Sequence, residues 1–324
     1  MALLPLLRCR NLLTEGPLLT EARKKIVVVG SITMDLVTRT PQIPRIGQTL
    51  IGTGFDTTPG GKGANQAVAA ARLGYPVAMV GKVGTDVYGP SLLENLARAG
   101  VDTSAMAHAE GSSGLAPMFV AETGENSIVV VPGANGAMDR AAVDAQAALI
   151  RSAGMVLCQL EIPMDTLAYT LALCAEAGVP AMLDPAPAAA LPDAVFSQVA
   201  WFTPNETEAA FYVGDDATTE ESAARLLAKG LRGVVLKRGS EGAYVAVAGG
   251  RAEWAPPFRV QAIDTVAAGD CFNGAFAVAL LEGRDPWAAA RFANAAAAIA
   301  VTRRGAQASM PSRADVDAFL AQHA

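Results

Sequence analysis

Short runs of consecutive apolar residues recur along the chain, separated by longer stretches with the spacing of helices. The first run, residues 26–29 (IVVV), is continuously hydrophobic, as expected of a strand buried on both faces. Similar runs predict strands at residues 77–80, 155–157, 179–183, 201–203 and 234–236. The stretches between and after them predict helices at about 62–73, 86–99, 139–152, 164–177, 205–213, 219–229, 268–281 and 286–302. This alternation predicts an α/β fold with a doubly wound, mainly parallel sheet.

Two regions, residues 35–58 and 115–131, interrupt this rhythm with strand-like segments that have no helix between them. The segments are residues 36–40, 49–57, 116–121 and 127–131, and the loop between the last two suits a hairpin. We expect them to form a small antiparallel sheet outside the main one, a natural lid over a cleft. The alternative is a pair of ordinary hairpins packed on the edge of the main sheet.

Composition narrows the class of protein. The chain has 324 residues, 52% of them hydrophobic, which is enough for a large core and excludes a disordered chain. A net charge of −6 without a basic run argues against nucleic acid or an anionic membrane as partner. The four cysteines form no C-x-x-C pair, so we predict neither a zinc site nor disulfides, and a reducing, cytoplasmic location. No apolar run is long enough to span a membrane.

Residues 1–24 differ from the rest of the chain. They are rich in leucine and interrupted by Pro5, Gly16 and Pro17, and their apolar run precedes Arg8 and Arg10, whereas a secretory signal has the reverse order. We predict a disordered N-terminal extension, with a transit peptide as the alternative. Residues 25–324 would then form one domain.

The first candidate motif is the glycine-rich segment at residues 59–67 (PGGKGANQA), which leads into a helix. Three glycines around Lys62 allow the backbone to approach a ligand closely, and the following helix N-terminus favours anions or polar oxygens. Gly63 stands where a P-loop has Ser or Thr, so this is not a P-loop. A simple turn before the helix is the alternative.

The second motif, residues 264–270 (DTVAAGD), opens the helix predicted at 268–281. Its small residues leave backbone N–H groups free to hold a developing negative charge. Asp270 could accept a proton from a hydroxyl nucleophile or merely cap the helix.

The third motif, residues 203–208 (TPNETE), follows a predicted strand. Asn205 and Glu208 face one side of the first helical turn, where they could hold the water shell of Mg²⁺. The same spacing fits a capping box.

The fourth motif, residues 237–242 (KRGSEG), follows the strand at 234–236. A Gly-x-x-Gly loop at the carboxyl end of a strand suits nucleotide phosphates or ribose. It equally suits a β-turn before the next strand, residues 243–247.

Taken together, these motifs give the chain a specific resemblance. In their order and spacing, residues 25–324 resemble the sugar-kinase family of ribokinase type. Further stretches that carry the resemblance are 30–32 (GSI), 159–161 (QLE), 184–188 (DPAPA) and 302–307 (TRRGAQ).

The resemblance implies transfer of the γ-phosphoryl group of ATP to a sugar hydroxyl, with D-ribose as the acceptor and D-ribose 5-phosphate as the product. It implies that Asp270 is the base for the 5-hydroxyl, and that the amides of Ala267, Ala268 and Gly269 form an anion hole. It also implies a homodimer that pairs through the lid.

The resemblance assigns the remaining site residues to four groups. Sugar contacts are implied for Thr33, Asp35, Gly60, Gly61, Lys62, Asn65, Glu161 and Asp270. Contacts with ATP are implied for Asn205, Lys237, Gly239, Ser240, Gly242, Gly269 and Asn294. Glu208, with Asn205, would organise Mg²⁺ through water. An activating K⁺ would be held by the side chains of Asp264 and Ser309 and by the carbonyls of Val266, Ala300, Arg303 and Gly305.

Two departures from the family pattern leave alternatives open. Ala267 stands where the family usually has Gly, and Thr33 stands where a sugar-contacting Asn is common. Residues 35–38 and 113–117 also resemble kinases of 2-deoxyribose, so either sugar, or less readily a nucleoside, could be the acceptor. A sugar- or nucleotide-binding regulator without catalysis is the alternative of another class, and the presence of Asp270 and Lys62 argues against it.

Overall fold

The main sheet of the computed structural model, which describes residues 23–323, has ten strands and is parallel over most of its width. The prediction for residues 1–24 therefore lies almost wholly outside the described residues. Along the sheet the order is β14-β13-β12-β11-β10-β9-β1-β4-β5, with β6 paired to β4. Only β13 runs against the other strands, because it is antiparallel to both of its neighbours, β12 and β14. The strands are β1 (Ile26–Val29), β4 (Val77–Gly84), β5 (Val101–Asp102), β6 (Met106–Ala109), β9 (Met155–Gln159), β10 (Ala181–Asp184), β11 (Trp201–Phe202), β12 (Gly233–Lys237), β13 (Ala243–Val247) and β14 (Ala252–Ala255).

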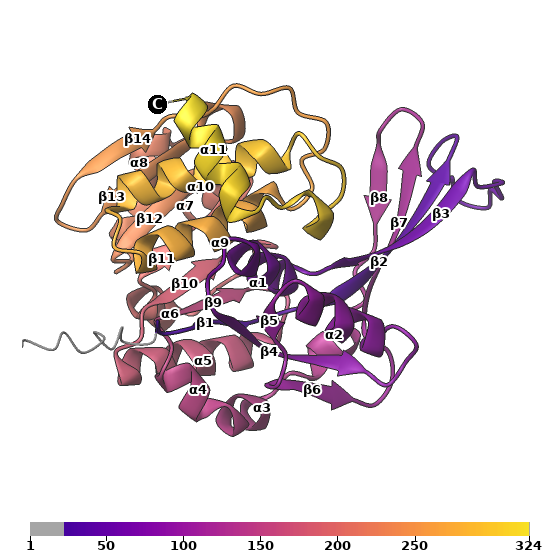
Figure 1. The fold of residues 1–324 in the computed structure, drawn as a ribbon, viewed down its shortest axis with the longest axis horizontal. Helices are drawn as coiled ribbons and strands as arrows, with labels where there is room; N and C mark the ends of the chain where they lie inside the picture. The colour runs from indigo at the N-terminus through magenta and orange to yellow at the C-terminus, as the bar shows by residue number, and fades with distance from the viewer. Residues whose placement is uncertain (1–22, 324) are drawn as a thin grey trace, which may run out of the picture.

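Helices cover both faces of this sheet, so the predicted doubly wound fold is confirmed (Figure 1). In β1, Ile26 and Val28 enter one apolar core and Val27 and Val29 the other, as the alternation of side chains along a strand requires. The first core is covered by α1 (Lys62–Arg72), α2 (Gly89–Arg98), α9 (Ala268–Leu281), α10 (Pro286–Ala300) and α11 (Arg313–Gln322). The second is covered by α3 (Arg140–Ala145), α4 (Ala147–Arg151), α5 (Met164–Ala177), α6 (Asp193–Gln198), α7 (Glu206–Val213) and α8 (Thr219–Leu227).

The contact between α1 and α9 is unusually close and positions the site. A Cβ on Gly274 of α9 would lie 2.7 Å from the Cβ of Ala69 and 2.8 Å from the carbonyl oxygen of Gln66. Only glycine therefore allows α9 to lie this near α1. The first turns of the two helices are brought side by side, which sets Asp270 against Asn65 and Gln66.

A second, four-stranded sheet projects from the main body as the predicted lid would (Figure 1). It has the order β3-β2-β7-β8, and its strands are β2 (Thr33–Thr40), β3 (Gly54–Gly60), β7 (Gly114–Ala121) and β8 (Asn126–Ile128). Because this sheet is separate, the edge-hairpin alternative is wrong.

The prediction of a purely antiparallel lid is also wrong, because the central pair, β2 and β7, is parallel, with Thr33 opposite Gly114. The other two pairs are antiparallel. Three residues separate the end of β1 from the start of β2. The first residues of β2 pair with the first residues of β7, so both strands leave the main body in the same direction (Figure 1).

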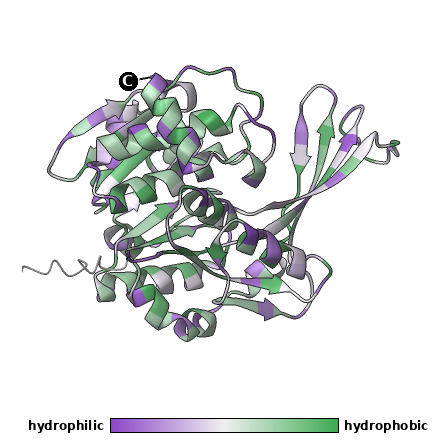
Figure 2. Ribbon diagram, viewed as in Figure 1, coloured by the Kyte–Doolittle hydropathy of each residue, from purple (hydrophilic) through white to green (hydrophobic). Residues whose placement is uncertain are grey.

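Apolar residues concentrate in the strands of the main sheet and the helix faces against them (Figure 2). The lid differs, because several large apolar side chains on it are exposed: Phe55, Phe119, Ile128, Val129 and Val130. Within residues 23–323, no helix has both the length and the apolar character that crossing a membrane requires.

Candidate active site

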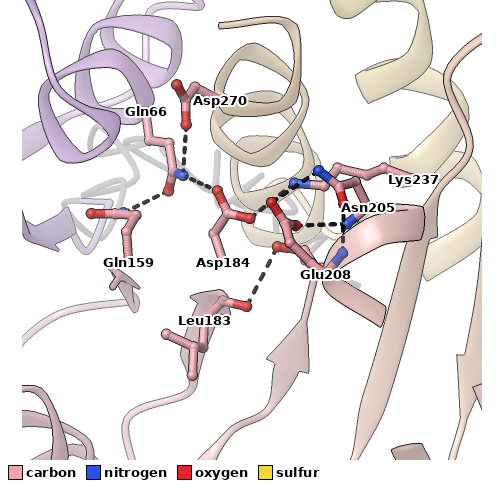
Figure 3. A network of polar contacts seen from close by, with 9 residues as sticks. Gln66, Gln159, Leu183, Asp184, Asn205, Glu208, Lys237 and Asp270 are labelled. Atoms are coloured by element: carbon pink, nitrogen blue, oxygen red, sulfur yellow. Dashed lines mark hydrogen bonds and ion pairs between the residues drawn. The ribbon is translucent and has the colours of Figure 1, made fainter. Parts of the chain in front are cut away.

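The polar side chains of the site gather where the parallel strands end. After β1 the chain passes through the lid into α1 and β4 on one side, whereas β9 lies on the other side of β1. Such a change of direction leaves a crevice at the carboxyl ends of the strands, which is where α/β proteins bind ligands. Gln159, Asp184 and Lys237 are the last residues of β9, β10 and β12, and they meet there (Figure 3).

The glycine-rich loop before α1 lies directly against the start of the lid. Gly61 has a φ of 90°, and a Cβ on it would come within 2.8 Å of the backbone of Ile32. A Cβ on Gly60 would lie 2.5 Å from the carboxylate of Asp35. Glycine is thus required at Gly61, and a side chain at Gly60 would displace the carboxylate of Asp35. The backbone N–H of Lys62 donates to Glu161 over 3.1 Å. The loop does more than turn the chain, because it brings Asp35 and Glu161 to one place.

Asp35 lies where burial and a neighbouring carboxylate both disfavour its negative charge. Burial raises its pKa to about 6, and the nearby Glu161 adds to the rise. The hydroxyl of Thr33 donates to Asp35 over 3.2 Å and opposes the shift. Carboxylates placed this way accept hydrogen bonds from the hydroxyls of an uncharged sugar.

Asp270 lies in the first turn of α9 and is only 6% exposed. It does not cap the helix, because Ala267 is the N-cap residue and no side chain caps it, so the capping alternative is wrong. Instead the side-chain amides of Asn65 and Gln66 donate to its two oxygens over 2.9 and 3.1 Å. Gln307 donates to the carbonyl oxygen of Asn65 over 3.1 Å and so fixes the direction of that amide.

Burial raises the pKa of Asp270 well above its ordinary value, and the charge of Asp184 adds to this. The ammonium of Lys62 and the two amides act in the opposite direction. Lys62 itself has its pKa raised: burial acts to lower it, but the charges of Asp270, Asp184, Glu161 and Glu208 together outweigh that effect.

The loop before α9 has the backbone expected of an anion hole. Ala267 is in the left-handed conformation, with φ 57° and ψ 14°, which explains why glycine suits this position. The N–H of Ala268 lies 3.3 Å from the carbonyl of Thr265, a weak bond that an anion could replace. Gly269 faces Lys237, whose Nζ would lie 3.4 Å from a Cβ built on it.

A buried polar network joins Asp270 to the ends of the strands (Figure 3). Gln66 donates to Asp184 over 2.9 Å as well as to Asp270, and accepts a bond of 2.7 Å from Gln159. Asp184 in turn forms an ion pair of 2.9 Å with Lys237. Gln66, Gln159 and Asp184 were not among the predicted site residues, although each is a polar residue at a strand end or beside Asn65.

Asn205 and Glu208 form the capping box that was the alternative reading of their spacing. The backbone and side-chain N–H groups of Asn205 donate to the two carboxylate oxygens of Glu208 over 2.7 and 2.9 Å. Burial raises the pKa of Glu208, and the charge of Lys237 opposes the shift. The pair lies beside Asp184 and Lys237 in the crevice (Figure 3), so its capping role leaves its place in the site intact.

Three of the predicted ATP residues, Gly239, Ser240 and Gly242, lie in the turn between β12 and β13, and Asn294 lies on α10. The N–H of Arg238 donates to the carbonyl of Gly242 over 2.8 Å, so the β-turn alternative is present, and Ser240 is exposed in that turn. Gly242 packs against the carbonyl of Ala255, which also accepts a bond of 3.0 Å from the side chain of Asn294. Gly242 and Asn294 therefore both contact the backbone at Ala255.

The predicted cation residues meet only in part. Asp264 accepts bonds of 3.0 and 2.9 Å from the N–H groups of Val266 and Gly305, and so ties two loops together. The N–H of Arg303 donates to the carbonyl of Ala300 over 3.0 Å. Ser309 donates its hydroxyl to the carbonyl of Ala306 over 2.8 Å, and no bond joins it to Asp264 in the described structure.

Comparison with known proteins identifies the family of the chain. Residues 23–313 match the pfkB family carbohydrate kinases, and the chain belongs to that family. It is 45% identical over 300 residues to the protein named ribokinase from Bacillus subtilis, covering 92% of this chain and 99% of the relative. A deoxyribokinase from Salmonella typhi is 36% identical, with coverage of 91% and 98%. The solved structure of Arabidopsis thaliana ribokinase with ribose and ATP has a TM-score of 0.88 at 34% identity, with coverage of 92% and 99%.

Proposed function

We propose that this chain transfers the γ-phosphoryl group of ATP to the 5-hydroxyl of D-ribose, giving D-ribose 5-phosphate and ADP. The observation that carries the proposal is the placement of Asp270, a buried carboxylate between the sugar-side residues of α1 and the helix N-terminus. The ribokinase relatives and the ribose and ATP complex of the Arabidopsis protein support this choice of substrates.

In the proposed reaction, Asp270 accepts the proton of the 5-hydroxyl as that oxygen bonds to the γ-phosphorus. The bond from this phosphorus to the bridging oxygen breaks at the same time, and ADP leaves with the electron pair. The amides of Asn65 and Gln66 favour the charged form of Asp270 until the hydroxyl arrives. The N–H groups at the start of α9 and the ammonium of Lys62 would stabilise the negative charge on the phosphoryl group during its transfer.

The sugar would lie between the glycine-rich loop and the lid. Asp35 and Glu161 would accept hydrogen bonds from its hydroxyls, with Asn65 at the reacting end. Asp35 comes from the lid, Asn65 from α1 and Glu161 from the loop after β9, so the sugar would connect three separate parts of the chain. This arrangement holds the 5-hydroxyl near Asp270 before reaction.

2-Deoxy-D-ribose is the second candidate substrate, and Thr33 is the observation that favours it. The hydroxyl of Thr33 donates to Asp35, and its side chain has no amide with which to bond a further sugar hydroxyl. The similarity to a deoxyribokinase points in the same direction. A site built to bond a hydroxyl rejects the analogue without it by large factors, so one residue can decide the preference.

An assay of ADP release with Mg·ATP and K⁺ tests both candidates. Ribose, 2-deoxyribose, fructose and adenosine would be compared by kcat/KM. We expect ribose to lead at least tenfold, which is about 1.4 kcal/mol of transition-state preference. A lead for deoxyribose would keep the mechanism and change the substrate. Inactivity on all four, from folded protein that binds ATP, would favour the regulator alternative.

We propose Mg²⁺ and K⁺ as cofactors. Glu208 and Asn205 supply the oxygen donors that Mg²⁺ uses, and one carboxylate is enough for an ion that keeps most of its waters. Asp264 and the carbonyls of the loop at 303–305 supply a hard oxygen set for K⁺. Mg²⁺ would screen the phosphate charges. Asp264 would fix the conformation of the anion-hole loop by accepting the hydrogen bond from the N–H of Val266.

K⁺ is expected to raise kcat/KM at fixed Mg·ATP, because Asp264 links the cation residues to the loop that carries Ala267. The measurement is a titration of K⁺ against a bulky organic cation at constant ionic strength. The Asp264→Asn variant should lose most of the response. Equal rates in both cations would contradict the cation site.

The rate should fall on the acid side of neutrality. Asp35 has a raised pKa of about 6 and that of Asp270 is raised as well, so both lose their charge near that pH. Because the sugar acceptor and the base both need the charged form, log kcat/KM should reach a plateau above about pH 7 and fall below about pH 6 with a slope above one. The Asp35→Asn variant should reduce that slope. A flat profile down to pH 5 would contradict both roles.

We propose that the chain forms a homodimer through the lid and works in the cytoplasm. The exposed side chains Phe55, Phe119 and Ile128 would be covered by a second copy. Phe55→Ser should then yield monomers in sedimentation, whereas a monomeric native chain would contradict the proposal. Cys158, Cys174 and Cys271 are unpaired and buried, which supports a reducing compartment.

A further inference from the structure

The ion pair between Lys237 and Asp184 is unusual for its burial. Their side chains are 13% and 3% exposed, and the pair joins the ends of β12 and β10, with β11 between them. Both ions lose water there, and such a pair seldom adds net stability compared with apolar residues of the same size. The pair is therefore better explained by what it positions than by what it stabilises.

The ammonium is held at one particular place. A Cβ built on Gly269 would lie 3.4 Å from Nζ of Lys237, so the charge lies over the first turn of α9, at the residue that precedes Asp270 in the chain. The negative charge of a transferring phosphoryl group would develop at this helix N-terminus. Within the described residues, the hydrogen bond of the Lys237 ammonium goes to Asp184, and its charge also acts on Glu208.

Asp184 uses its two oxygens for two different tasks. Oδ1 accepts from Lys237 over 2.9 Å, and Oδ2 accepts from Gln66 over 2.9 Å. The same Nε2 of Gln66 donates to Asp270 over 3.1 Å. The base and the ammonium are thus fixed relative to one another through a buried chain of two side chains (Figure 3).

We propose that Asp184 is a positioning residue that holds the Lys237 ammonium over the N-terminus of α9. There the ammonium stabilises the negative charge of the transferring phosphoryl group. This proposal rests on the proposed phosphoryl transfer and assigns the charge of Lys237 to the γ-phosphoryl end of ATP. No proton leaves Lys237 in the step, because its ammonium acts only as a charge and a hydrogen-bond donor.

The Asp184→Asn variant separates the two tasks of Asp184. The side-chain oxygen of an Asn can still accept from Gln66. Its NH₂ group then faces Lys237, and because it cannot accept a hydrogen bond, the ammonium is no longer held. Lys237→Met removes the ammonium itself. Lys82→Met is the matched control, because Lys82 also forms a carboxylate ion pair, its side chain is 15% exposed, and it lies outside the site.

Steady-state kinetics of the two variants and their combination form the first measurement. We expect Lys237→Met to lower kcat by about 10²–10³, the usual loss for one such donor, with KM for ribose unchanged. Asp184→Asn should lower kcat at least tenfold, and the double variant should match Lys237→Met alone. A double variant that loses the product of both factors would overturn the proposal, because Asp184 would then act without Lys237.

Nucleotide binding gives a second measurement that does not depend on the sugar. Calorimetry would compare ADP with a β,γ-imido analogue of ATP in all three variants. Lys237→Met and Asp184→Asn should weaken the analogue and leave ADP unchanged, and Lys82→Met should alter neither. If analogue binding is unchanged in both site variants, the proposal fails even where ribose is phosphorylated. If ribose is not a substrate but both site variants still bind the analogue more weakly, only the assignment of the sugar fails.

A Mg²⁺ titration addresses the remaining explanation, that Asp184 binds the metal. Under the proposal, kcat of Asp184→Asn stays low at saturating Mg²⁺. Recovery of kcat at high Mg²⁺ would identify Asp184 as a metal ligand and overturn its role in positioning Lys237.

Discussion

Asp270→Asn is expected to abolish measurable turnover while ribose still binds with nearly native affinity. The carboxylate is the only group of the first turn of α9 that can take a proton from the sugar, and loss of a general base typically costs about 10²–10⁴ in rate. The amide that replaces it cannot accept from both Asn65 and Gln66, so some stability is lost as well.

A control variant distinguishes these two effects. Asp86 is another carboxylate held by several hydrogen bonds, from Ser113, Tyr88 and Gly89, but it lies at the start of α2, outside the site. Asp86→Asn should lower the melting temperature and leave kcat unchanged. Calorimetry of ribose binding to Asp270→Asn completes the comparison. Full activity of Asp270→Asn would show that the base is another group.

Lys62→Met is the second change with a large expected effect. The charge of Lys62 lies among the carboxylates of Asp270, Asp184, Glu161 and Glu208, and it holds the pKa of Asp270 down. Its loss would remove the positive charge that we propose stabilises the phosphoryl group, with an expected cost of about 10²–10³ in kcat. It also raises the pKa of Asp270 further, so the acid limb of the pH profile should move to higher pH.

The shift of the pH profile is the decisive readout for Lys62. A residue that only shaped the loop would lower the rate without moving the profile. Lys62→Arg keeps the charge and should therefore restore the position of the limb, although not the full rate, because a guanidinium has another shape. An unchanged limb in Lys62→Met would contradict the electrostatic role.

The fold was predictable to the extent that hydrophobic runs define buried strands. The run at 26–29 became β1 without change, and 164–177 and 268–281 became α5 and α9 with the predicted bounds. The helix predicted at 139–152 is divided at Gln146, and α11 was missed. α11 buries only Val316 completely, so it has little of the apolar pattern on which the prediction relied.

The lid shows why strand direction was harder to predict than strand existence. The apolar run at 116–121 indicates a strand, but nothing local indicates the direction of the neighbouring strand. The neighbour of β7 is β2, far away in the sequence, and their parallel register depends on where both strands leave the main body. Only the β7–β8 hairpin had a turn between its strands that predicted its direction.

Site residues were predictable where they belong to one local motif. The prediction was incomplete where side chains from distant parts of the chain meet. Asp270 was proposed from its own motif and Asn65 from the family resemblance, and the structure adds that they are bonded to each other. Asp184 was noted only as part of a family resemblance, because its role depends on Lys237, two strands away in the sheet. A polar residue at the last position of a buried strand is the signal that could have identified it.

The parallel pairing of β2 and β7 also has a consequence for the order in which the chain folds. β4 and α2 lie between Thr33 and Gly114 in the chain, so pairing these two residues closes a long loop. The entropy cost of that closure is not offset by local contacts early in folding. We therefore expect the lid to be among the last parts to order, with hydrogen exchange faster in β2 than in β1. During synthesis, Asp35 could pair first with Thr58 of β3, and its second neighbour, β7, would become available only once residues 114–121 had been made.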